Sequence, residues 1–124
     1  MLAPVHDFDV LSLLFERSED AVVVCNSEAE IVLFNATASR IYGNPHSVVL
    51  ADCPKMFGMH LPDASRLYLV EELPMSRALA GEEVRAIEIL LRAPNRPESR
   101  VRVDAYPVRS NERIVGAIVR SRRI

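Results

Sequence analysis

The sequence predicts an α+β domain in which short central helices cover one face of a five-stranded antiparallel sheet, with a further helix at the N-terminus. Two observations support this prediction. β-branched runs form a block of two strands within residues 21–34 and a block of three within residues 84–120, and helix and turn signals separate the blocks. A chain of 124 residues suits one such domain. We expect residues 19–121 to form it, between a flanking segment at 1–18 and a truncated linker at 122–124.

Apolar residues of the first segment recur at helical spacing, and Asp7 or Asp9 can cap the start of the helix. They cover more than one face, so one face can rest on the domain while the other meets a second copy. We therefore expect a parallel homodimer contact, formed by Phe8, Val10, Leu11, Leu14 and Phe15.

A hairpin that runs directly into a helix is the next prediction. Two β-branched runs, at 21–25 and 31–34, are separated by a polar turn, and Asn35 follows the second run with no loop between. Asparagine is a good N-cap because its side-chain oxygen accepts a hydrogen bond from an orphan N–H of the first turn. Asn35 is therefore expected to end a strand and begin a helix over 37–42, which Gly43 ends in the left-handed conformation.

The middle of the chain combines irregular stretches with one helix. Residues 44–70 carry scattered prolines and one glycine, which predicts loops and short helical turns. Residues 71–81 read EELPMSRALAG, with acids at the start, a proline near the first turn and a glycine at the end. This order predicts a helix.

Three strands are predicted in the last third of the chain, over residues 84–92, 99–108 and 113–120. Apolar residues alternate in the first two of them, at Ile87, Ile89 and Leu91 and at Val101, Val103 and Ala105. Alternation of this kind gives a strand one core face and one solvated face.

Charge is distributed unevenly along the chain, although the net charge is only −2. Acids outnumber bases before residue 84, and arginines dominate after it. A basic segment can bind nucleic acid, but these arginines alternate with or flank β-branched residues, as on a solvated sheet face. Lys55 is the only lysine and no row of aromatic residues accompanies them, so no nucleic-acid partner is expected.

The cysteines and the N-terminus indicate a cytoplasmic protein. Cys25 and Cys53 share no CxxC pattern, and we interpret them as free thiols of a reducing compartment. No apolar run approaches the roughly 20 residues that cross a bilayer. The first residues also lack a basic flank and a cleavage site, so neither a secretory signal nor a membrane contact is expected.

Four stretches resemble the PAS domain of bacterial sensor histidine kinases and related signalling proteins. They read SEDAVVVCN, IVLFNATASRIYG, EELPMSRALAGEEV and DAYPVRSNERIVGAIV, and the third is the most specific. The hairpin turns NSEAE and SNER lack the glycine usual in the family, so we expect them to be longer or irregular. The chain ends at SRRI, where the family often continues through an Asp-Ile-Thr triplet into a signalling helix, which suggests an excised sensor piece.

The resemblance implies a non-catalytic sensory and regulatory role, in which a small ligand lies between the inner face of the sheet and the central helices. A homodimer and a C-terminal output domain in the parent protein are the implied partners. The positions that correspond to the pocket are Asn35, Ile41, Tyr42, Met56, Phe57, Met75, Leu79, Ile87, Ile89 and Tyr106. Few polar groups converge there, which suits an apolar ligand, or a core filled by its own side chains, better than a carboxylate.

Neither a cofactor nor a metal is expected. Haem-sensing relatives present an axial histidine from the helix before the third strand, and residues 72–80 contain none. Light-sensing relatives use a cysteine within Gly-x-Asn-Cys-Arg-Phe-Leu-Gln to form an adduct with a flavin. Cys53 lies near that place but lacks the neighbouring Asn, Arg and Gln. His46, Cys53 and His60 are evenly spaced but lack the tight ligand pair of zinc sites.

An enzymatic alternative depends on Glu88. A cone-shaped α+β enzyme, like the ketosteroid isomerase-like proteins, needs a buried acid as base, and Glu88 lies among apolar neighbours. The interpretation that we prefer places Glu88 on the outer, arginine-lined face, paired with Arg100 or Arg102. The chain contains no GxSxG, HExxH or phosphate-binding glycine loop that would favour catalysis.

A charged residue in the N-terminal helix tests the dimer contact. Leu11→Asp or Leu14→Asp places a carboxylate in that contact, where burial without a partner is unfavourable. We expect each variant to sediment as a monomer with an unchanged far-UV circular dichroism spectrum, whereas Ser12→Asp should remain dimeric. An unchanged sedimentation coefficient for both leucine variants would contradict the assignment.

Overall fold

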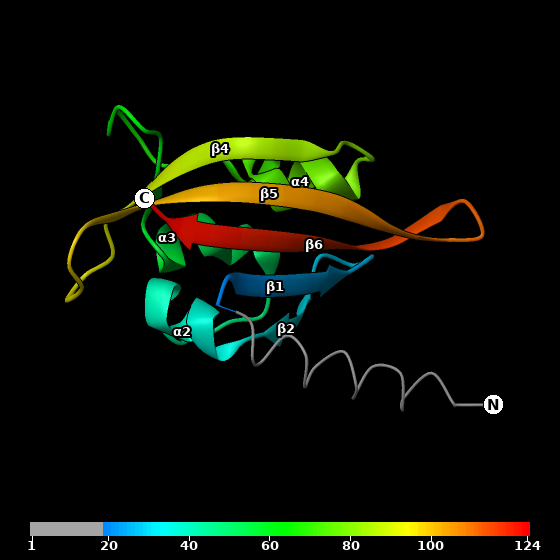
Figure 1. Cartoon of the computed structure of the whole chain (residues 1–124), viewed down its shortest axis with the longest axis horizontal. Coiled ribbons are helices and arrows are strands. Elements are labelled where there is room, and N and C mark those ends of the chain that lie inside the picture. Colours follow the sequence, from blue (N-terminus) through cyan, green and yellow to red (C-terminus); the bar gives the residue numbers. More distant parts are fainter. Residues whose placement is uncertain (1–18) are drawn as a thin grey trace.

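An antiparallel sheet forms one layer of the structure, and short helices cover one of its faces (Figure 1). The computed structural model describes residues 19–124. In chain order the elements are β1 (Ala21–Asn26), β2 (Ile31–Phe34), α2 (Ala36–Tyr42), the 3₁₀ helix η1 (Leu50–Asp52), α3 (Cys53–Met56), β3 (Met59–His60), the 3₁₀ helix η2 (Val70–Glu72), α4 (Pro74–Leu79), β4 (Val84–Leu91), β5 (Ser99–Ser110) and β6 (Arg113–Arg123). The strand order β2-β1-β6-β5-β4-β3 joins the two predicted strand blocks through β1 and β6.

The sheet has six strands rather than the five that the sequence predicts. The additional strand, β3, pairs with the end of β4 through Met59 and His60 alone. Gly58 permits this approach, since its φ is +62° and a Cβ on it would lie 2.2 Å from the carbonyl oxygen of Arg92. A strand of two residues has no readable alternation, which is why the sequence did not predict it.

Asn35 connects the first strands to α2, as predicted. Its side-chain oxygen accepts hydrogen bonds from the N–H of Val22 (3.0 Å) and of Ala38 (2.9 Å). Its side-chain amide donates to the carbonyl oxygen of Asp20 (3.0 Å), and the residue is completely buried. One side chain therefore caps α2 and fixes the helix to the start of β1.

The glycine after α2 differs from its predicted conformation. Gly43 has φ 91° and ψ 173°, so it is not in the left-handed helical region, although its N–H donates to the carbonyl oxygen of Ser39. A Cβ at this position would lie 3.3 Å from the guanidinium group of Arg96. Glycine is needed here for the positive φ and for the close approach of that side chain.

Residues 71–81 form parts of two short helices instead of the single helix predicted. η2 ends at Glu72 and α4 begins at Pro74, with Leu73 extended between them (φ −64°, ψ 145°). A proline ring disfavours the α conformation of the residue before it, so Pro74 starts one helix and separates it from the other.

No helix among residues 19–124 is long and apolar enough to cross a membrane.

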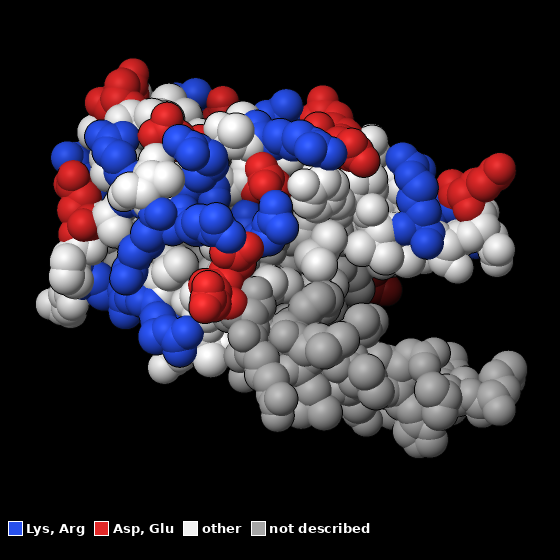
Figure 2. Space-filling model, viewed as in Figure 1, with Lys and Arg blue, Asp and Glu red and all other residues white. Residues whose placement is uncertain are grey.

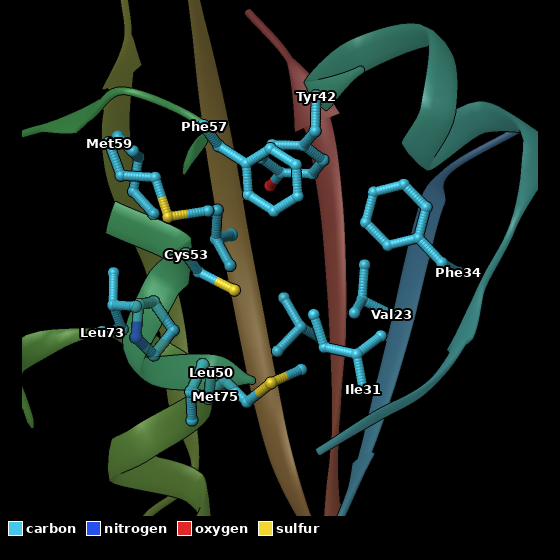
Figure 3. Close-up of a pocket in the computed structure, with 14 residues that line it drawn as sticks. Val23, Ile31, Phe34, Tyr42, Leu50, Cys53, Phe57, Met59, Leu73 and Met75 are labelled. Carbon is cyan, nitrogen blue, oxygen red and sulfur yellow. The ribbon is translucent and has the colours of Figure 1, made fainter. Parts of the chain in front are cut away.

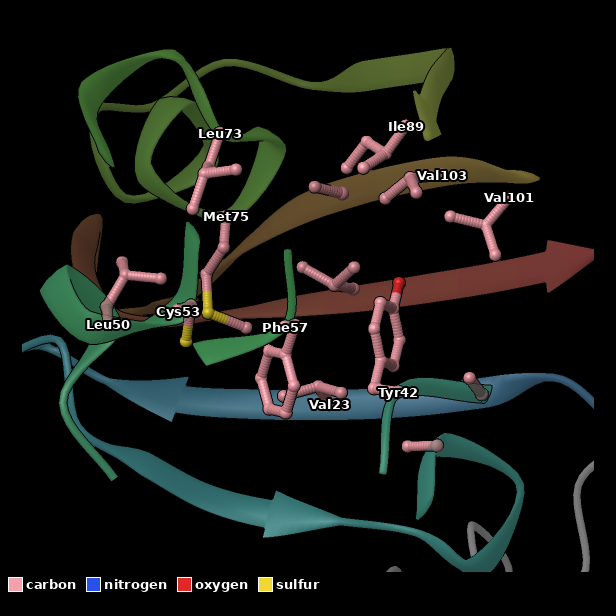
Figure 4. Close-up of a cluster of buried hydrophobic side chains, with 14 of the residues drawn as sticks. Val23, Tyr42, Leu50, Cys53, Phe57, Leu73, Met75, Ile89, Val101 and Val103 are labelled. Carbon is pink, nitrogen blue, oxygen red and sulfur yellow. The ribbon is translucent and has the colours of Figure 1, made fainter. Parts of the chain in front are cut away.

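The inner faces of β4, β5 and β6 provide much of the core (Figure 4). Val101, Val103 and Ala105 are at most 1% exposed, and Ile89 and Leu91 of β4 are buried beside them, as the alternation predicts. β5 and β6 are longer than predicted and end at Ser110 and Arg123.

Both hairpin turns are expected to be longer or irregular, and the structure shows a different irregularity in each. The first contains Ala29 at φ 61°, and the β1–β2 register shifts beside it, so it is irregular as expected. The second consists of two residues, Asn111 and Glu112, with φ of 51° and 67°. Positive φ at both positions is typical of a compact two-residue hairpin turn, so this turn is not longer. The β5–β6 register shifts between Val108 and Arg109, so the hairpin is irregular as expected.

The predicted N-terminal helix lies outside the described residues. The dimer contact that it is expected to carry, through Phe8, Val10, Leu11, Leu14 and Phe15, therefore stays a prediction.

Removing the Asn35 side chain tests its role in connecting α2 to β1. Asn35→Ala leaves the buried N–H groups of Val22 and Ala38 without their partner, so the free energy of unfolding should fall by about 2–4 kcal/mol. Asn26→Ala is the matched control, since its side-chain oxygen also accepts two backbone N–H groups but at an exposed turn. Water can replace those bonds, so the control should cost under about 1 kcal/mol in urea titrations. Equal losses would contradict the assignment.

Candidate functional site

A cavity of about 50 Å³ lies between the inner face of the sheet and the central helices (Figure 3). Sheet and helical elements both contribute to its wall. The lining residues are Val23, Ile31, Phe34, Tyr42, Leu50, Cys53, Phe57, Met59, Leu73, Pro74, Met75, Ile89, Val103 and Val119. The wall is almost entirely apolar, because the Tyr42 hydroxyl bonds elsewhere and the Cys53 thiol is a weak polar group.

Three aromatic rings form one side of the cavity (Figure 3). The ring centroids of Tyr42 and Phe57 are 5.4 Å apart, those of Phe34 and Phe57 5.9 Å, and those of Phe34 and Tyr42 6.3 Å. Ring pairs at these separations attract one another beyond the burial of their area. Tyr42 therefore has an aromatic neighbour on more than one side, and its ring position depends on both phenylalanines.

Flexible side chains form another side of the cavity. Met59 and Met75 reach the cavity from β3 and α4, and Leu50 and Leu73 lie beside them (Figure 3). Methionine has three rotatable side-chain bonds and a polarisable sulfur, so it adapts to the shape of a neighbour. This side can change shape more readily than the aromatic side.

The two polar side chains in the wall are neutral near physiological pH. Burial raises the pKa of Tyr42 to about 12, although the hydrogen bond with Ser121 lowers it in part. Burial, with a smaller contribution from the charge of Asp52, raises the pKa of the Cys53 thiol to about 12. The Cys53 Sγ makes one weak contact, 3.9 Å to the carbonyl oxygen of Val49. The cavity thus presents no charge and no reactive thiolate.

The residues expected in a pocket divide into groups. Four line the cavity, namely Tyr42, Phe57, Met75 and Ile89. Four belong to the surrounding core without lining it, namely Ile41, Met56, Leu79 and Ile87. Asn35 is buried, but its side chain is engaged in the hydrogen bonds at the start of α2.

Tyr106 requires a correction, because it lies on the opposite face of the sheet. Its neighbours Ala105 and Val103 alternate toward the core, while Tyr106 lies beneath the Arg85 guanidinium, 5.6 Å from the ring centroid. Strand alternation places the residue next to an inward residue on the outer face.

Ten of the lining residues were not predicted, and three of these lie on the first strands. Val23, Ile31 and Phe34 reach the cavity because the sheet curls toward the helices at the β1–β2 side. The alternation of β1 was available as a signal for Val23. Nothing in the local pattern predicts how far a sheet curls.

The outer face of the sheet carries mixed charge (Figure 2). Arg120 lies 3.2 Å from Asp104 and 3.6 Å from Asp20, and Arg122 lies 2.8 Å from Asp20. These contacts indicate a solvated, ion-paired sheet face rather than an uncompensated basic surface.

Glu88 lies in the exposed part of this outer face, opposite Arg102 in the β4–β5 register. The enzymatic alternative thus loses its buried base. Among residues 19–124 no three His, Cys, Asp or Glu side chains are grouped to hold a metal ion. His60 instead places its ring Nδ1 2.9 Å from the carbonyl oxygen of Gly58.

Comparison with known proteins gives one family. The family described as the PAS fold matches residues 15–124. No curated protein matches the chain.

Solved structures with the same fold are similar over nearly the whole chain. The PAS domain of an HTR-like protein from Haloarcula marismortui is 19% identical, with a TM-score of 0.61, covering 97% of this chain and 93% of that chain. The PAS domain of nitrogen regulation protein NR(II) from Vibrio parahaemolyticus is 13% identical, with a TM-score of 0.59, covering 93% and 98%. The LOV protein of Rhodobacter sphaeroides is 14% identical, with a TM-score of 0.61, covering 98% and 68%. At these identities the likeness shows the fold alone.

The raised pKa of Tyr42 predicts an alkaline loss of stability. The native pKa of about 12 lies above the ordinary value of 10.0, so the folded state holds this proton more tightly than the unfolded state does. The contribution of Tyr42 to the free energy of unfolding is therefore fully present below pH 10. It falls by about 1.4 kcal/mol per pH unit as the pH rises toward 12. Urea titrations between these values should show this slope in Cys53→Ala, which removes one thiol whose pKa burial also raises. Burial raises the pKa of Cys25 and of Tyr68 as well, so the contribution of Tyr42 is the difference that Tyr42→Phe makes in this background.

Tyr42→Phe in the Cys53→Ala background should remove the contribution of Tyr42 to the slope of the free energy of unfolding against pH. Tyr106→Phe, on the outer face, should leave that contribution in place. A slope that is as steep in Tyr42→Phe as in its Cys53→Ala parent would show that Tyr42 is not responsible.

Proposed function

The chain belongs to the PAS fold family, and from that premise we propose that it is a non-catalytic sensor that receives a small, uncharged, apolar ligand in the cavity. The family supplies sensory and regulatory modules of signalling proteins. In this chain the inner cavity is the place where such a module would meet its ligand. The apolar character of the wall is the single observation that carries the proposal.

The wall excludes charged ligands by its chemistry. A carboxylate or ammonium group buried without a partner is strongly disfavoured, and Tyr42 and Cys53, the two polar side chains of the wall, are neutral near physiological pH. The Tyr42 hydroxyl already has a partner in Ser121. An apolar molecule needs no such partner and gains from leaving water.

The size of the cavity restricts the ligand further. A cavity needs roughly 10–15 Å³ to hold a water molecule, and this one measures about 50 Å³. A few non-hydrogen atoms therefore fit without rearrangement. A larger molecule requires Met59 or Met75 to change rotamer, and the flexibility of methionine favours that response.

The parent protein that we propose is a bacterial sensor histidine kinase or a related regulator, with an output domain following this one and a homodimer formed through residues 1–18. The motif EELPMSRALAGEEV, which resembles a segment of the PAS modules of such kinases, supports this context. The exposed position of Glu88 argues against the enzymatic alternative.

Native mass spectrometry tests the proposal directly. A ligand bound tightly enough to survive gentle purification should appear as an additional mass that disappears on denaturation. Val119→Ile adds a methyl group to the wall and should reduce the ligand-bound fraction several-fold, because overpacking a filled cavity is unfavourable. Val32→Ile makes the same chemical change at a residue that is 45% exposed and serves as the control.

A chain without additional mass, and without binding of small apolar probes such as xenon, would contradict ligand sensing. The result would then favour a module that acts through assembly alone, with its core filled by its own side chains.

A further inference from the structure

The last turn of α2 is joined to the end of β6 by two hydrogen bonds. The hydroxyl oxygens of Tyr42 and Ser121 lie 2.5 Å apart. Two residues after Ser121, the Arg123 guanidinium donates to the carbonyl oxygen of Arg40 (3.2 Å). The part of β6 that leads into residue 124 is therefore attached to the helix that carries Tyr42.

These two bonds differ in their exposure to water. Tyr42 is 6% exposed and Ser121 is 1% exposed, whereas the bond from Arg123 lies at the surface. Water can replace a surface bond at little cost. Separating the two buried hydroxyls would leave both without a partner, so they are expected to move together.

Tyr42 belongs to the cavity wall and to this hydrogen bond at the same time. Its ring lines the cavity beside Phe34 and Phe57. Figure 4 shows the ring beside Phe57 with the hydroxyl directed toward β6. Because a phenol ring is rigid, any displacement of the ring within the wall also displaces its hydroxyl.

Ser121 occupies a position from which a displacement reaches both neighbouring strands. It lies opposite Ala21 of β1 and Val103 of β5 in the sheet register. Val103 lines the cavity, and Ala21 starts the strand that Asn35 fixes to α2. A shift at Ser121 thus affects the beginning of β1 and the end of β6, which are the two places where the described domain begins and ends.

We propose that the hydrogen bond between Tyr42 and Ser121 transmits displacements of the cavity wall to the C-terminal end of β6. Tyr42 is a positioning residue in this arrangement, and Ser121 receives the displacement. The inference rests on the proposed function only for the origin of the displacement, a ligand in the cavity. The coupling itself can be tested without any ligand.

The experiment perturbs the wall and measures amide chemical shifts of the full ¹⁵N-labelled chain. Phe57→Leu removes the ring nearest to Tyr42 and should shift the amide resonances of Ser121, Arg122, Arg123 and Ile124. The same change in a Tyr42→Phe background, which keeps the ring but removes the hydroxyl, should shift them at least about threefold less. Phe34→Leu provides a second wall variant should Phe57→Leu fold poorly.

The matched control is Tyr68→Phe, which removes a hydroxyl that donates to the carbonyl oxygen of Glu88. Phe57→Leu in this background should shift the end of β6 as in the parent. Equal shifts in the Tyr42→Phe and parent backgrounds, or no shift in the parent, would overturn the proposal.

Xenon separates this proposal from the proposed function. If xenon shifts the methyl resonances of Val119 and Met75 and also the amide resonances of residues 121–124, the result supports both ligand sensing and the coupling. Methyl shifts without a response of β6 would overturn the coupling alone. If xenon does not enter and the chain carries no additional mass, ligand sensing fails, and the Phe57 series still decides whether the coupling exists.

Discussion

The position of α2 depends on buried hydrogen bonds at its two ends, and the cavity depends on the position of α2. The Asn35 side chain caps the start of the helix and binds Val22 of β1 and Asp20 just before it, and Tyr42 fixes the end of the helix to β6. The aromatic side of the cavity follows from this, since Phe34 directly precedes the cap and Tyr42 ends the helix. Each of these polar groups is satisfied in the interior, so the helix has one favoured position over the sheet.

Buried polar side chains and the apolar cavity wall occupy separate parts of this small domain, so the interior can contain both. The described residues contain no buried side-chain nitrogen or oxygen atom without a hydrogen-bond partner. The side-chain polar groups of Asn35 and Ser121 are used to join elements and leave the cavity apolar. A polar ligand would have to compete with these internal bonds, and the fold would lose an anchor where the ligand gained a partner.

Much of the fold was predictable from the sequence, because alternation and capping are local signals. The inner faces of β4 and β5 and the double role of Asn35 were predicted in this way. The extra strand β3 and the break at Leu73 were not. The alternation of β5 is consistent with the outward position of Tyr106, and its assignment to the pocket, which the resemblance implied, was wrong. The candidate site was predicted only in part, since the contribution of β1 and β2 depends on the curl of the sheet. Sequence periodicity defines the face of a strand but not the curvature of the sheet.

Because its wall has no free polar groups, this cavity can distinguish ligands only by their size and shape. Discrimination by shape in an apolar site is worth about 1–3 kcal/mol per methylene group. The best very small ligands gain about 1.5 kcal/mol per non-hydrogen atom, so a ligand of three such atoms would bind with a dissociation constant near the millimolar range. A ligand that fits the cavity as it stands must therefore be abundant in order to shift a conformational equilibrium. A scarce ligand has to be larger, and binding it requires Met59 and Met75 to change rotamer together with a smaller displacement of the hydrogen-bonded Tyr42 ring.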